Sequence, residues 1–308
     1  MEDKTIYDLI VLGTGPAGIT AAIYAYRYNL SFLLIGEIMG GNMIYPTKVN
    51  NFPGFAEISG LELTERFKKH LEFFNIKSLQ QQVVKITENN NVFDVTTKEN
   101  KQFYARNILV ALGTLKRRLN VSGEDKYIGR GVHYCATCDA IFYKNKVVAV
   151  VGGGDAANSA ALMLSDIAQY VYQIVNVSNL EGDQDKINQL KSKTNVAFIF
   201  NNTIQEIKGN QKVEQIVLKN EFNNQKLLNV DGIFIEIGGI PNVSLLNNLG
   251  VRFDSDGFII VNKKQETNIS GIYAAGDITS THKGFKQIVT AVSEGAIAAY
   301  YIYQNSKK

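Results

Sequence analysis

Hydrophobic and polar residues follow two different periods along this chain of 308 residues. Short β-branched apolar runs, such as residues 7–12 and 146–151, are typical of strands buried on both faces of a parallel sheet. Apolar positions with a helical period occur in the alanine-rich segment that runs to residue 28 and over residues 61–74. Other segments alternate apolar and polar residues and predict antiparallel strands. The pattern predicts an α/β protein.

The same order of segments occurs twice. Each copy is expected to hold a buried strand, a glycine turn, a helix, a second strand, an antiparallel meander and a returning strand. In the first copy the strands fall at residues 7–12, 31–35, 83–86, 92–96, 102–105 and 107–113. In the second copy they fall at residues 146–151, 170–175, 196–200, 203–207, 213–218, 226–229 and 232–238, the four from 196 to 229 forming the meander. We therefore expect two Rossmann-like, three-layer dinucleotide-binding domains.

A strand over residues 271–277 and a long helix from about residue 287 to 303 follow the second copy. Because they have no domain of their own, they most economically complete the first domain. The second domain is then inserted in the first. The predicted boundaries are residues 1–116 with 245–308 for the first domain, and 117–244 for the insertion.

Gly13, Gly15 and Gly18 form a GxGxxG sequence between the first strand and the first helix. The first glycine permits the tight turn, the second lets backbone amides approach a pyrophosphate, and the third lets the helix pack closely on the strand. Glu37 follows the second strand, where an acidic ribose ligand is expected, although an exposed loop acid is the alternative. A second turn of the form GxGxxA, residues 152–157, opens the second copy.

The only two cysteines lie in the sequence Cys135-Ala-Thr-Cys138-Asp139. Two cysteines this close are not the disulfide framework of a secreted scaffold, and in a reducing compartment they indicate catalysis or metal binding. Half of a zinc site would need two further ligands, which the widely separated histidines do not offer, so no metal is expected. Asp139 is either a catalytic acid or a helix-cap residue. His133 could tune Cys135, but a packed or surface histidine is the simpler interpretation.

Charge and composition exclude several classes of function. A net charge of +3 with scattered lysines gives no case for nucleic acid or a membrane surface. The one local basic run, residues 116–118, is expected to be a solvated connector. No apolar run reaches the 18 or so residues of a membrane span, and the polar start leaves no room for a signal peptide. We expect a cytoplasmic protein.

Two nucleotide turns, a Cys-x-x-Cys before the second and a late Gly-Asp strand together resemble the low-molecular-weight thioredoxin reductases. The resemblance covers nearly the whole chain, and it implies an FAD-dependent thioredoxin-disulfide reductase that forms a homodimer. Lys286 stands where the family more often has arginine, whose fork an ammonium cannot reproduce. The expected FAD-binding residues are Gly13, Gly15, Pro16, Ala17, Gly18, Glu37, Gly40, Gly41, Asn42, Asn51, Val84, Gly113, Gly276, Asp277, Lys286 and Gln287. The residues expected to bind a pyridine nucleotide are Gly152, Gly154, Asp155 and Ala157.

The resemblance also implies roles at the redox motif. Cys138 would face the flavin, Cys135 would attack the disulfide of thioredoxin or a thioredoxin-like protein, and Asp139 would protonate the departing thiolate or the flavin. Both the cysteine pair and the second nucleotide turn must meet one flavin. The family resolves this by rotating the inserted domain, and single connectors near residues 114–119 and 241–246 are compatible with such a hinge.

The electron donor stays open. Family members that use NADPH carry a His-Arg-Arg-x-x-x-Arg run after the second strand of the inserted domain, whereas residues 176–182 here contain no basic residue. An acid at the end of that strand would favour NADH, but the residue is Asn176, with Glu181 nearby in sequence. NADPH, NADH and ferredoxin are therefore all candidates. The alternatives are a ferredoxin-dependent flavin thioredoxin reductase and a flavin-bound redox sensor.

Overall fold

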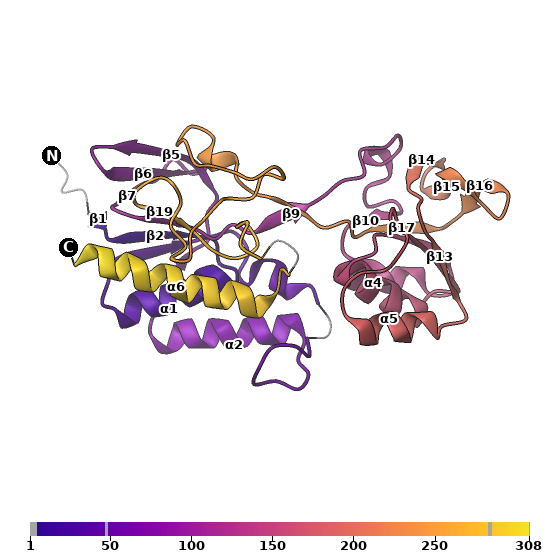
Figure 1. Ribbon diagram of the computed structural model, residues 1–308, viewed down its shortest axis with the longest axis horizontal. Helices are drawn as coiled ribbons and strands as arrows, with labels where there is room; N and C mark the ends of the chain where they lie inside the picture. The colour runs from indigo at the N-terminus through magenta and orange to yellow at the C-terminus, as the bar shows by residue number, and fades with distance from the viewer. Residues whose placement is uncertain (1–4, 47–48, 283–284, 308) are drawn as a thin grey trace. The chain divides into compact units, whose positions relative to one another are not determined.

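The computed structural model describes residues 5–46, 49–282 and 285–307 (Figure 1). The chain divides into two compact units, one formed by Met1–Leu115 with Ile240–Lys308 and the other by Lys116–Gly239. The second unit is thus inserted in the first. At the two crossings, β9 (Thr114–Lys116) pairs with β18 (Gly239–Pro241). The expected α/β class, with one dinucleotide-type unit inserted in another, is confirmed.

The first unit has three layers around a parallel sheet. The sheet has the order β19-β8-β2-β3-β4, formed by Ile272–Ala274, Ile108–Val110, Leu9–Leu12, Phe32–Ile35 and Ser78–Leu79. On one face lie α1 (Pro16–Arg27) and α6 (Ile288–Ser306), with α2 (Gly60–Phe73) beside α1 (Figure 1). α1 and α6 approach closely because small residues face each other, and a Cβ on Gly295 would lie 2.1 Å from the Ala17 carbonyl oxygen.

A second, mixed sheet covers the other face of the first unit. Its order is β1-β7-β6-β5, formed by Ile6–Tyr7, Gln102–Ala105, Val92–Thr97 and Val83–Asn89. β5, β6 and β7 are antiparallel, and β1 pairs in parallel with β7. Phe93 and Val95 of β6 pack with Ile10 and Leu12 of β2 in the core between the sheets. Short 3-10 helices complete the unit at Gly41–Ile44 and Ser244–Leu246.

The second unit repeats this plan. Its parallel sheet has the order β10-β17-β11-β12-β13, formed by Val132–His133, Gly232–Ile235, Val147–Val151, Tyr170–Ile174 and Val196–Ile199. The helices α4 (Asp155–Ser165) and α5 (Gln184–Lys191) accompany it. The antiparallel sheet consists of β14 (Ile204–Gly209), β15 (Val213–Phe222) and β16 (Gln225–Asn229). The redox motif forms the short helix α3 (Ala136–Asp139), between the 3-10 turns Asp125–Tyr127 and Ala140–Tyr143.

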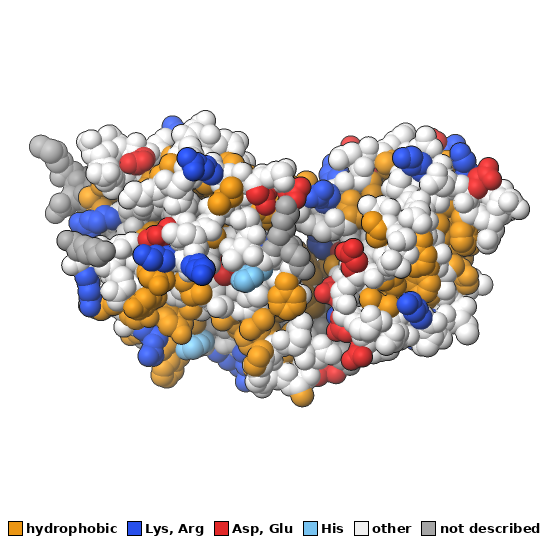
Figure 2. Space-filling view, viewed as in Figure 1, with side chains coloured by type: hydrophobic (Ala, Val, Ile, Leu, Met, Phe, Trp, Pro, Cys, Tyr) orange, Lys and Arg blue, Asp and Glu red, His pale blue; other side chains and the backbone are white. Residues whose placement is uncertain are grey.

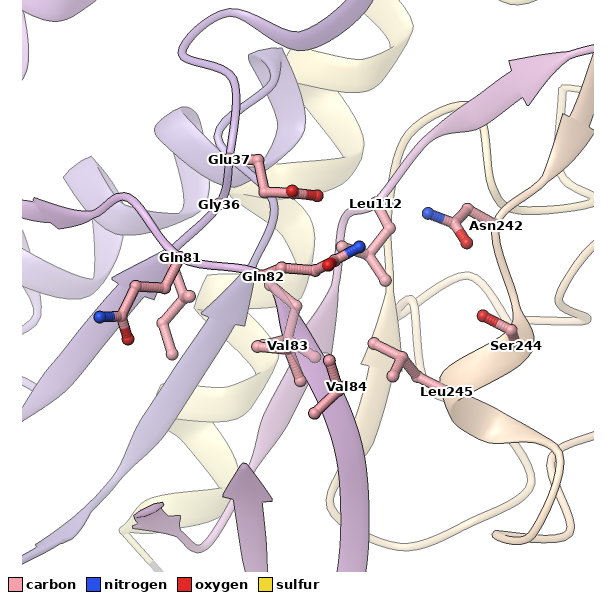
Figure 3. Close-up of a pocket in the computed structure, with 12 residues that line it drawn as sticks. Gly36, Glu37, Gln81, Gln82, Val83, Val84, Leu112, Asn242, Ser244 and Leu245 are labelled. Carbon is pink, nitrogen blue, oxygen red and sulfur yellow. The ribbon is translucent and has the colours of Figure 1, made fainter. Parts of the chain in front are cut away.

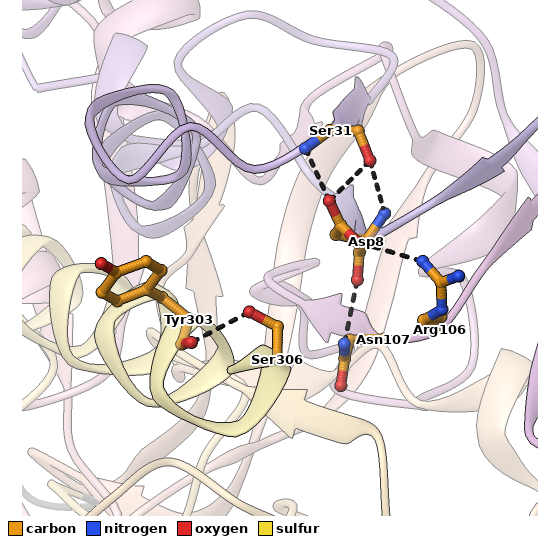
Figure 4. Close-up of polar contacts among 6 residues, drawn as sticks. All are labelled: Asp8, Ser31, Arg106, Asn107, Tyr303 and Ser306. Atoms are coloured by element: carbon orange, nitrogen blue, oxygen red, sulfur yellow. Dashed lines mark hydrogen bonds and ion pairs between the residues drawn. The ribbon is translucent and has the colours of Figure 1, made fainter. Parts of the chain in front are cut away.

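Two strand predictions were wrong in detail. Residues 196–200 were expected in the meander, but β13 pairs in parallel with β12, because the unpredicted helix α5 carries the chain back to the sheet edge. The run 7–12 divides at Asp8 into β1 and β2, which belong to different sheets. The Asp8 carboxylate accepts hydrogen bonds from the Ser31 amide (2.9 Å) and hydroxyl (2.7 Å) and pairs with Arg106 (3.2 Å), which fixes this crossover (Figure 4).

The surface carries charges of both signs. Lysine and arginine side chains are scattered over the face shown in Figure 2 rather than gathered in one patch. Within the described part of the chain, none of the helices combines the length and apolar character needed to cross a membrane.

Candidate functional site

The redox motif is a closed disulfide at the start of α3. Cys135 and Cys138 are bonded to each other, with their Cα atoms 5.4 Å apart. Cys135 has an extended backbone and caps the helix, since its Sγ accepts a hydrogen bond from the Cys138 amide at 3.2 Å. Cys138 is exposed, whereas Cys135 is partly buried. An amide N–H on a sulfur favours the thiolate over the thiol, so this contact stabilises charge on Cys135 once the pair is reduced.

Asp139 does not stand alone beside the disulfide. Its Oδ2 lies 2.8 Å from Nδ1 of His133, whose Nε2 lies 2.7 Å from the Tyr143 hydroxyl. The His133 ring stacks on Phe234, with the ring centres 5.2 Å apart. Burial, together with the charges of Asp139 and Asp231, raises the pKa of Tyr143 to about 12. His133 is therefore packed, as the simpler interpretation held, and it also contacts the candidate acid.

Glu236 is a site residue that the sequence analysis missed. It follows β17, its side chain is 7% exposed, and one carboxylate oxygen lies 3.0 Å from Nζ of Lys116. Burial raises the pKa of the Glu236 carboxyl, while Lys116 and a hydrogen bond from the Ala136 amide oppose this. The carboxylate thus touches the backbone between the two cysteines. The signal was present as a single acid in the apolar run of residues 232–237.

The basic run 116–118 is accordingly not just a solvated connector. Lys116 pairs with Glu236. Arg118 pairs with Asp125, and its Nε also donates a hydrogen bond to the Tyr134 hydroxyl at 3.3 Å. These roles depend on the partners Glu236, Asp125 and Tyr134, which the basic run itself does not indicate.

The first glycine turn is packed so closely against neighbouring backbone that side chains would not fit at Gly13 and Gly18. Gly13 has a φ of +114°, and a Cβ there would lie 2.2 Å from the Ala111 carbonyl oxygen. A Cβ on Gly18 would lie 1.9 Å from the Gly13 carbonyl oxygen. Gly15 precedes Pro16, the first residue of α1, and a Cβ on Gly41 would lie 3.3 Å from the Gly15 Cα. The predicted residues 13–18 and 40–41 are therefore brought together at the N-terminus of α1, which suits a pyrophosphate.

A pocket of about 260 Å³ opens beside this turn (Figure 3). In Figure 3 the side chains of Glu37, Gln82, Asn242 and Ser244 point into the same space. The lining brings the predicted Glu37 and Val84 together. It consists of Leu12, Ile35, Gly36, Glu37, Gln81, Gln82, Val83, Val84, Leu112, Asn242, Ser244 and Leu245.

The late Gly-Asp strand also meets α1. A Cβ on Gly276 would lie 3.1 Å from Cβ of Ala17, so the predicted Ala17 and Gly276 are neighbours. The Gly276 amide donates to the buried Glu294 carboxylate at 2.7 Å. Burial raises the pKa of Asp277, against the effect of Lys286. Glu294, from α6, was not predicted, because its role depends on a backbone amide 18 residues away.

The remaining predicted FAD residues form three further contacts. The Asn51 side-chain amide donates to Oε1 of Gln287 at 2.9 Å, which joins two loops far apart in sequence. The Asn42 side-chain amide donates to the Thr114 carbonyl oxygen at 3.1 Å, next to Gly113. Lys286 donates to the Thr279 carbonyl oxygen. The close-packed glycine turn at the start of α1 and the pocket beside Glu37 fit a dinucleotide cofactor such as FAD.

The second glycine turn is packed against the chain that follows β12. A Cβ on Gly152 would lie 2.3 Å from the Glu236 carbonyl oxygen, and Ala157 is buried. The Glu181 amide donates to the Gly153 carbonyl oxygen at 2.7 Å. Asp155, the first residue of α4, accepts a hydrogen bond from the Asp183 amide at 2.7 Å. A Cβ on Gly154 would meet no atom within 4 Å, so this part of the turn has open space.

A redox disulfide and two dinucleotide-type turns define a dinucleotide-dependent disulfide oxidoreductase. The profile of the pyridine nucleotide-disulphide oxidoreductase family matches residues 7–295, and the chain belongs to this family. It is 35% identical to a thioredoxin reductase of Mycoplasma pneumoniae, over 98% of this chain and 96% of the relative. The crystal structure of Lactococcus lactis thioredoxin reductase superposes with a TM-score of 0.92 at 34% identity, over 97% of this chain and 98% of that chain. A ferredoxin-flavin thioredoxin reductase of Clostridium acetobutylicum gives 0.54 at 33% identity, over 98% of each chain.

The resemblance to thioredoxin reductases expected from the sequence is therefore confirmed. The protein is an oxidoreductase, and it belongs to a family whose members bind FAD and a nicotinamide nucleotide.

Proposed function

We propose that this protein reduces the disulfide of thioredoxin or a thioredoxin-like protein, using FAD and the Cys135–Cys138 pair. The observation that carries the proposal is the disulfide at the start of α3, with exposed Cys138 and a carboxylate directly after it. The thioredoxin reductases among its relatives support thioredoxin as the substrate. When bound, FAD supplies the electron pair that opens the disulfide.

The first unit is the proposed FAD domain and the second the proposed pyridine nucleotide domain, with boundaries at residues 1–116 with 245–308, and 117–244. The glycine turn at residues 13–18, the pocket beside Glu37 and the partly buried Asp277 support the first assignment. Glu37 would accept from ribose hydroxyls, and the N-terminus of α1 would hold the pyrophosphate. The glycine turn before α4 supports the second assignment.

The chain's own residues carry the thiol chemistry. Two electrons and two protons convert the Cys135–Cys138 disulfide into a dithiol. The Cys135 thiolate, favoured by the Cys138 amide, attacks one sulfur of the partner disulfide and releases the other as a thiolate. The Cys138 thiolate then attacks Cys135, which restores the disulfide and frees the reduced partner. Asp139 is the acid that supplies the proton to the departing thiolate.

One experiment tests this function directly. Purified protein should carry flavin absorbance and sustain many turnovers of thioredoxin, whereas Cys138→Ser should abolish turnover and retain flavin. Full disulfide reductase activity in Cys138→Ser, or protein without flavin, would overturn the proposal. A single reduction of the disulfide without sustained turnover would instead support a flavin-bound redox sensor.

A ferredoxin-dependent flavin thioredoxin reductase is the second candidate. It is favoured by the absence of basic residues in 176–182, and one structural relative is a ferredoxin-flavin thioredoxin reductase. Anaerobic mixing with NADPH, NADH or reduced ferredoxin, followed by flavin absorbance, separates the donors. Rapid bleaching by either nicotinamide would exclude the need for ferredoxin.

We also propose a homodimer and a cytoplasmic location. Both rest on the family resemblance, and the second also on a cysteine content confined to the redox pair. Sedimentation of the purified protein tests the first, and fractionation of cells tests the second.

A further inference from the structure

We propose that His133 is a positioning residue that joins Asp139 to Tyr143 in a proton relay serving the Cys135–Cys138 pair. The proposal rests on the disulfide chemistry proposed above. His133 lies two positions before Cys135, and its ring nitrogens contact Asp139 and Tyr143 instead of the sulfurs.

The geometry satisfies both ring nitrogens of His133 at once. Nδ1 lies 2.8 Å from the Asp139 carboxylate, and Nε2 lies 2.7 Å from the Tyr143 hydroxyl. The His133 side chain is only 10% exposed, and the ring is held between Phe234, which stacks on it, and Tyr143, which meets it edge-on. A ring packed in this way keeps its nitrogens aimed at the same two partners.

This arrangement keeps every hydrogen bond in either protonation state of Asp139. When Asp139 is a carboxylate, neutral His133 donates from Nδ1 to Asp139 and accepts at Nε2 from the Tyr143 hydroxyl. When Asp139 is protonated, it donates to Nδ1, and His133 in its other tautomer donates from Nε2 to the Tyr143 oxygen. A glutamine amide cannot exchange the two roles in place, because its oxygen only accepts and its nitrogen only donates. His133 can therefore hold Asp139 in place while the acid gives up and regains its proton.

The relay has an exit to water. His133 and Asp139 both line a hollow of about 350 Å³ in the second unit, together with Ile128, Gly129, Val132, Tyr134 and Phe142. The Asp139 side chain is 31% exposed there. The other charged groups that reach the relay are Lys146, with its ammonium 5.2 Å from the centre of the Tyr143 ring, and Asp231. Asp139 can thus regain from solvent the proton that it supplies to the departing thiolate.

Four variants of the holoenzyme test the relay. His133→Gln keeps a polar side chain that cannot exchange donor and acceptor, and we expect it to lower kcat about 10-fold or more, with KM for thioredoxin unchanged. The acid limb of the kcat–pH profile should change as well. Asp139→Asn should have an effect of about 10²-fold or more, and His133→Gln/Asp139→Asn should be no worse than Asp139→Asn, because residues that act as a unit are not additive. Tyr143→Phe should have a smaller effect.

The matched control is Tyr127→Phe. Tyr127 also carries a buried hydroxyl in the second unit, but this hydroxyl bonds to the Gly209 carbonyl oxygen and to Lys126 instead of the relay. It should leave kcat and its pH profile unchanged. Additive losses in the double variant, or wild-type kcat and pH profile in His133→Gln, would overturn the proposal.

A second measurement does not depend on thioredoxin. The redox equilibrium of the Cys135–Cys138 pair with a small dithiol, followed against pH, should change its slope in His133→Gln and not in Tyr127→Phe. If wild-type protein fails to turn over thioredoxin yet shows this difference, the proposed substrate is wrong and the relay stands. An identical pH dependence in wild type and His133→Gln would contradict the relay and leave the proposed reduction of thioredoxin unaffected.

Discussion

Replacing Lys116 with methionine should leave the buried Glu236 carboxylate without its counter-charge. The pair has an N–O distance of 3.0 Å, and the Glu236 side chain is 7% exposed. Removing one partner of a fully buried pair costs about 3–5 kcal/mol. Because the Lys116 side chain is 38% exposed, solvent already screens part of this interaction, and we expect about 1–3 kcal/mol near neutral pH. For a unit of this size the loss corresponds to a fall in Tm of roughly 3–10 °C.

The sign of the pH dependence follows from the direction of the Glu236 pKa. Burial raises this pKa in the folded protein above its unfolded value, even with Lys116 opposing it. The protonated carboxyl is therefore accommodated at low pH, and its contribution to stability is lost as pH rises through the folded pKa. Without Lys116 the folded pKa rises further. The Lys116→Met deficit should accordingly be small near pH 5, where Glu236 can take up a proton, and larger near pH 8.

Thermal unfolding of the second unit at these two pH values is the assay. Lys144→Met, which removes an exposed lysine of the same unit, is the control and should have little effect. Lys116→Met/Glu236→Gln should lose the pH dependence, because a neutral amide needs no counter-charge. An equal deficit at both pH values, or a double variant as pH-sensitive as Lys116→Met, would refute the reasoning.

Three further predictions concern the nucleotide sites and α6. Gly18→Ala should lose FAD and stability because its Cβ would lie 1.9 Å from a carbonyl oxygen, whereas Gly154→Ala, with no atom within 4 Å, should retain flavin absorbance. Glu294→Leu should lower the free energy of unfolding in urea by about 1–3 kcal/mol, since the Gly276 amide and the Thr279 hydroxyl lose their buried acceptor. The control is Ser306→Ala, at an exposed position of the same helix. Val177→Arg/Ser178→Arg should lower KM for NADPH by about 10-fold relative to NADH, because guanidinium groups bind phosphate bidentately; equal effects on both nucleotides would contradict a phosphate contact.

The parts of the fold that were predicted correctly depend on local sequence. The runs at β2 and β11 are apolar at every position, and each glycine turn stands directly between its strand and its helix. The errors arose where contacts with residues distant in sequence determine which sheet a strand joins. Residues 196–199 were assigned to the wrong sheet because their own pattern does not distinguish an edge strand of the parallel sheet from a meander strand, and the polar helix α5 before them gave a weak signal.

In the functional site, too, some residues were predicted from local sequence, and others depend on contacts that only the fold forms. The spacing of Gly13 and Gly18 predicts a nucleotide turn, and the spacing of the two cysteines predicts a redox pair. His133 and Glu236 have no such spacing, because each acquires its role from a partner: Tyr143 ten residues away and Lys116 120 residues away. A single sequence carries no record of such pairs until the fold brings them together.

The partners of Asp139 and Glu236 explain how a redox helix can keep two carboxylates beside it. Negative charge near a dithiol opposes formation of the thiolate that attacks the substrate. Asp139 is met by His133 and Glu236 by Lys116, so each carboxylate has a basic partner within hydrogen-bond distance. The partners differ in one respect. The Lys116 ammonium supplies a counter-charge that holds Glu236 at the Ala136 amide, whereas in the proposed relay the imidazole exchanges tautomers as Asp139 gives up and regains a proton. The same helix therefore has one carboxylate suited to holding its backbone and another suited to proton transfer.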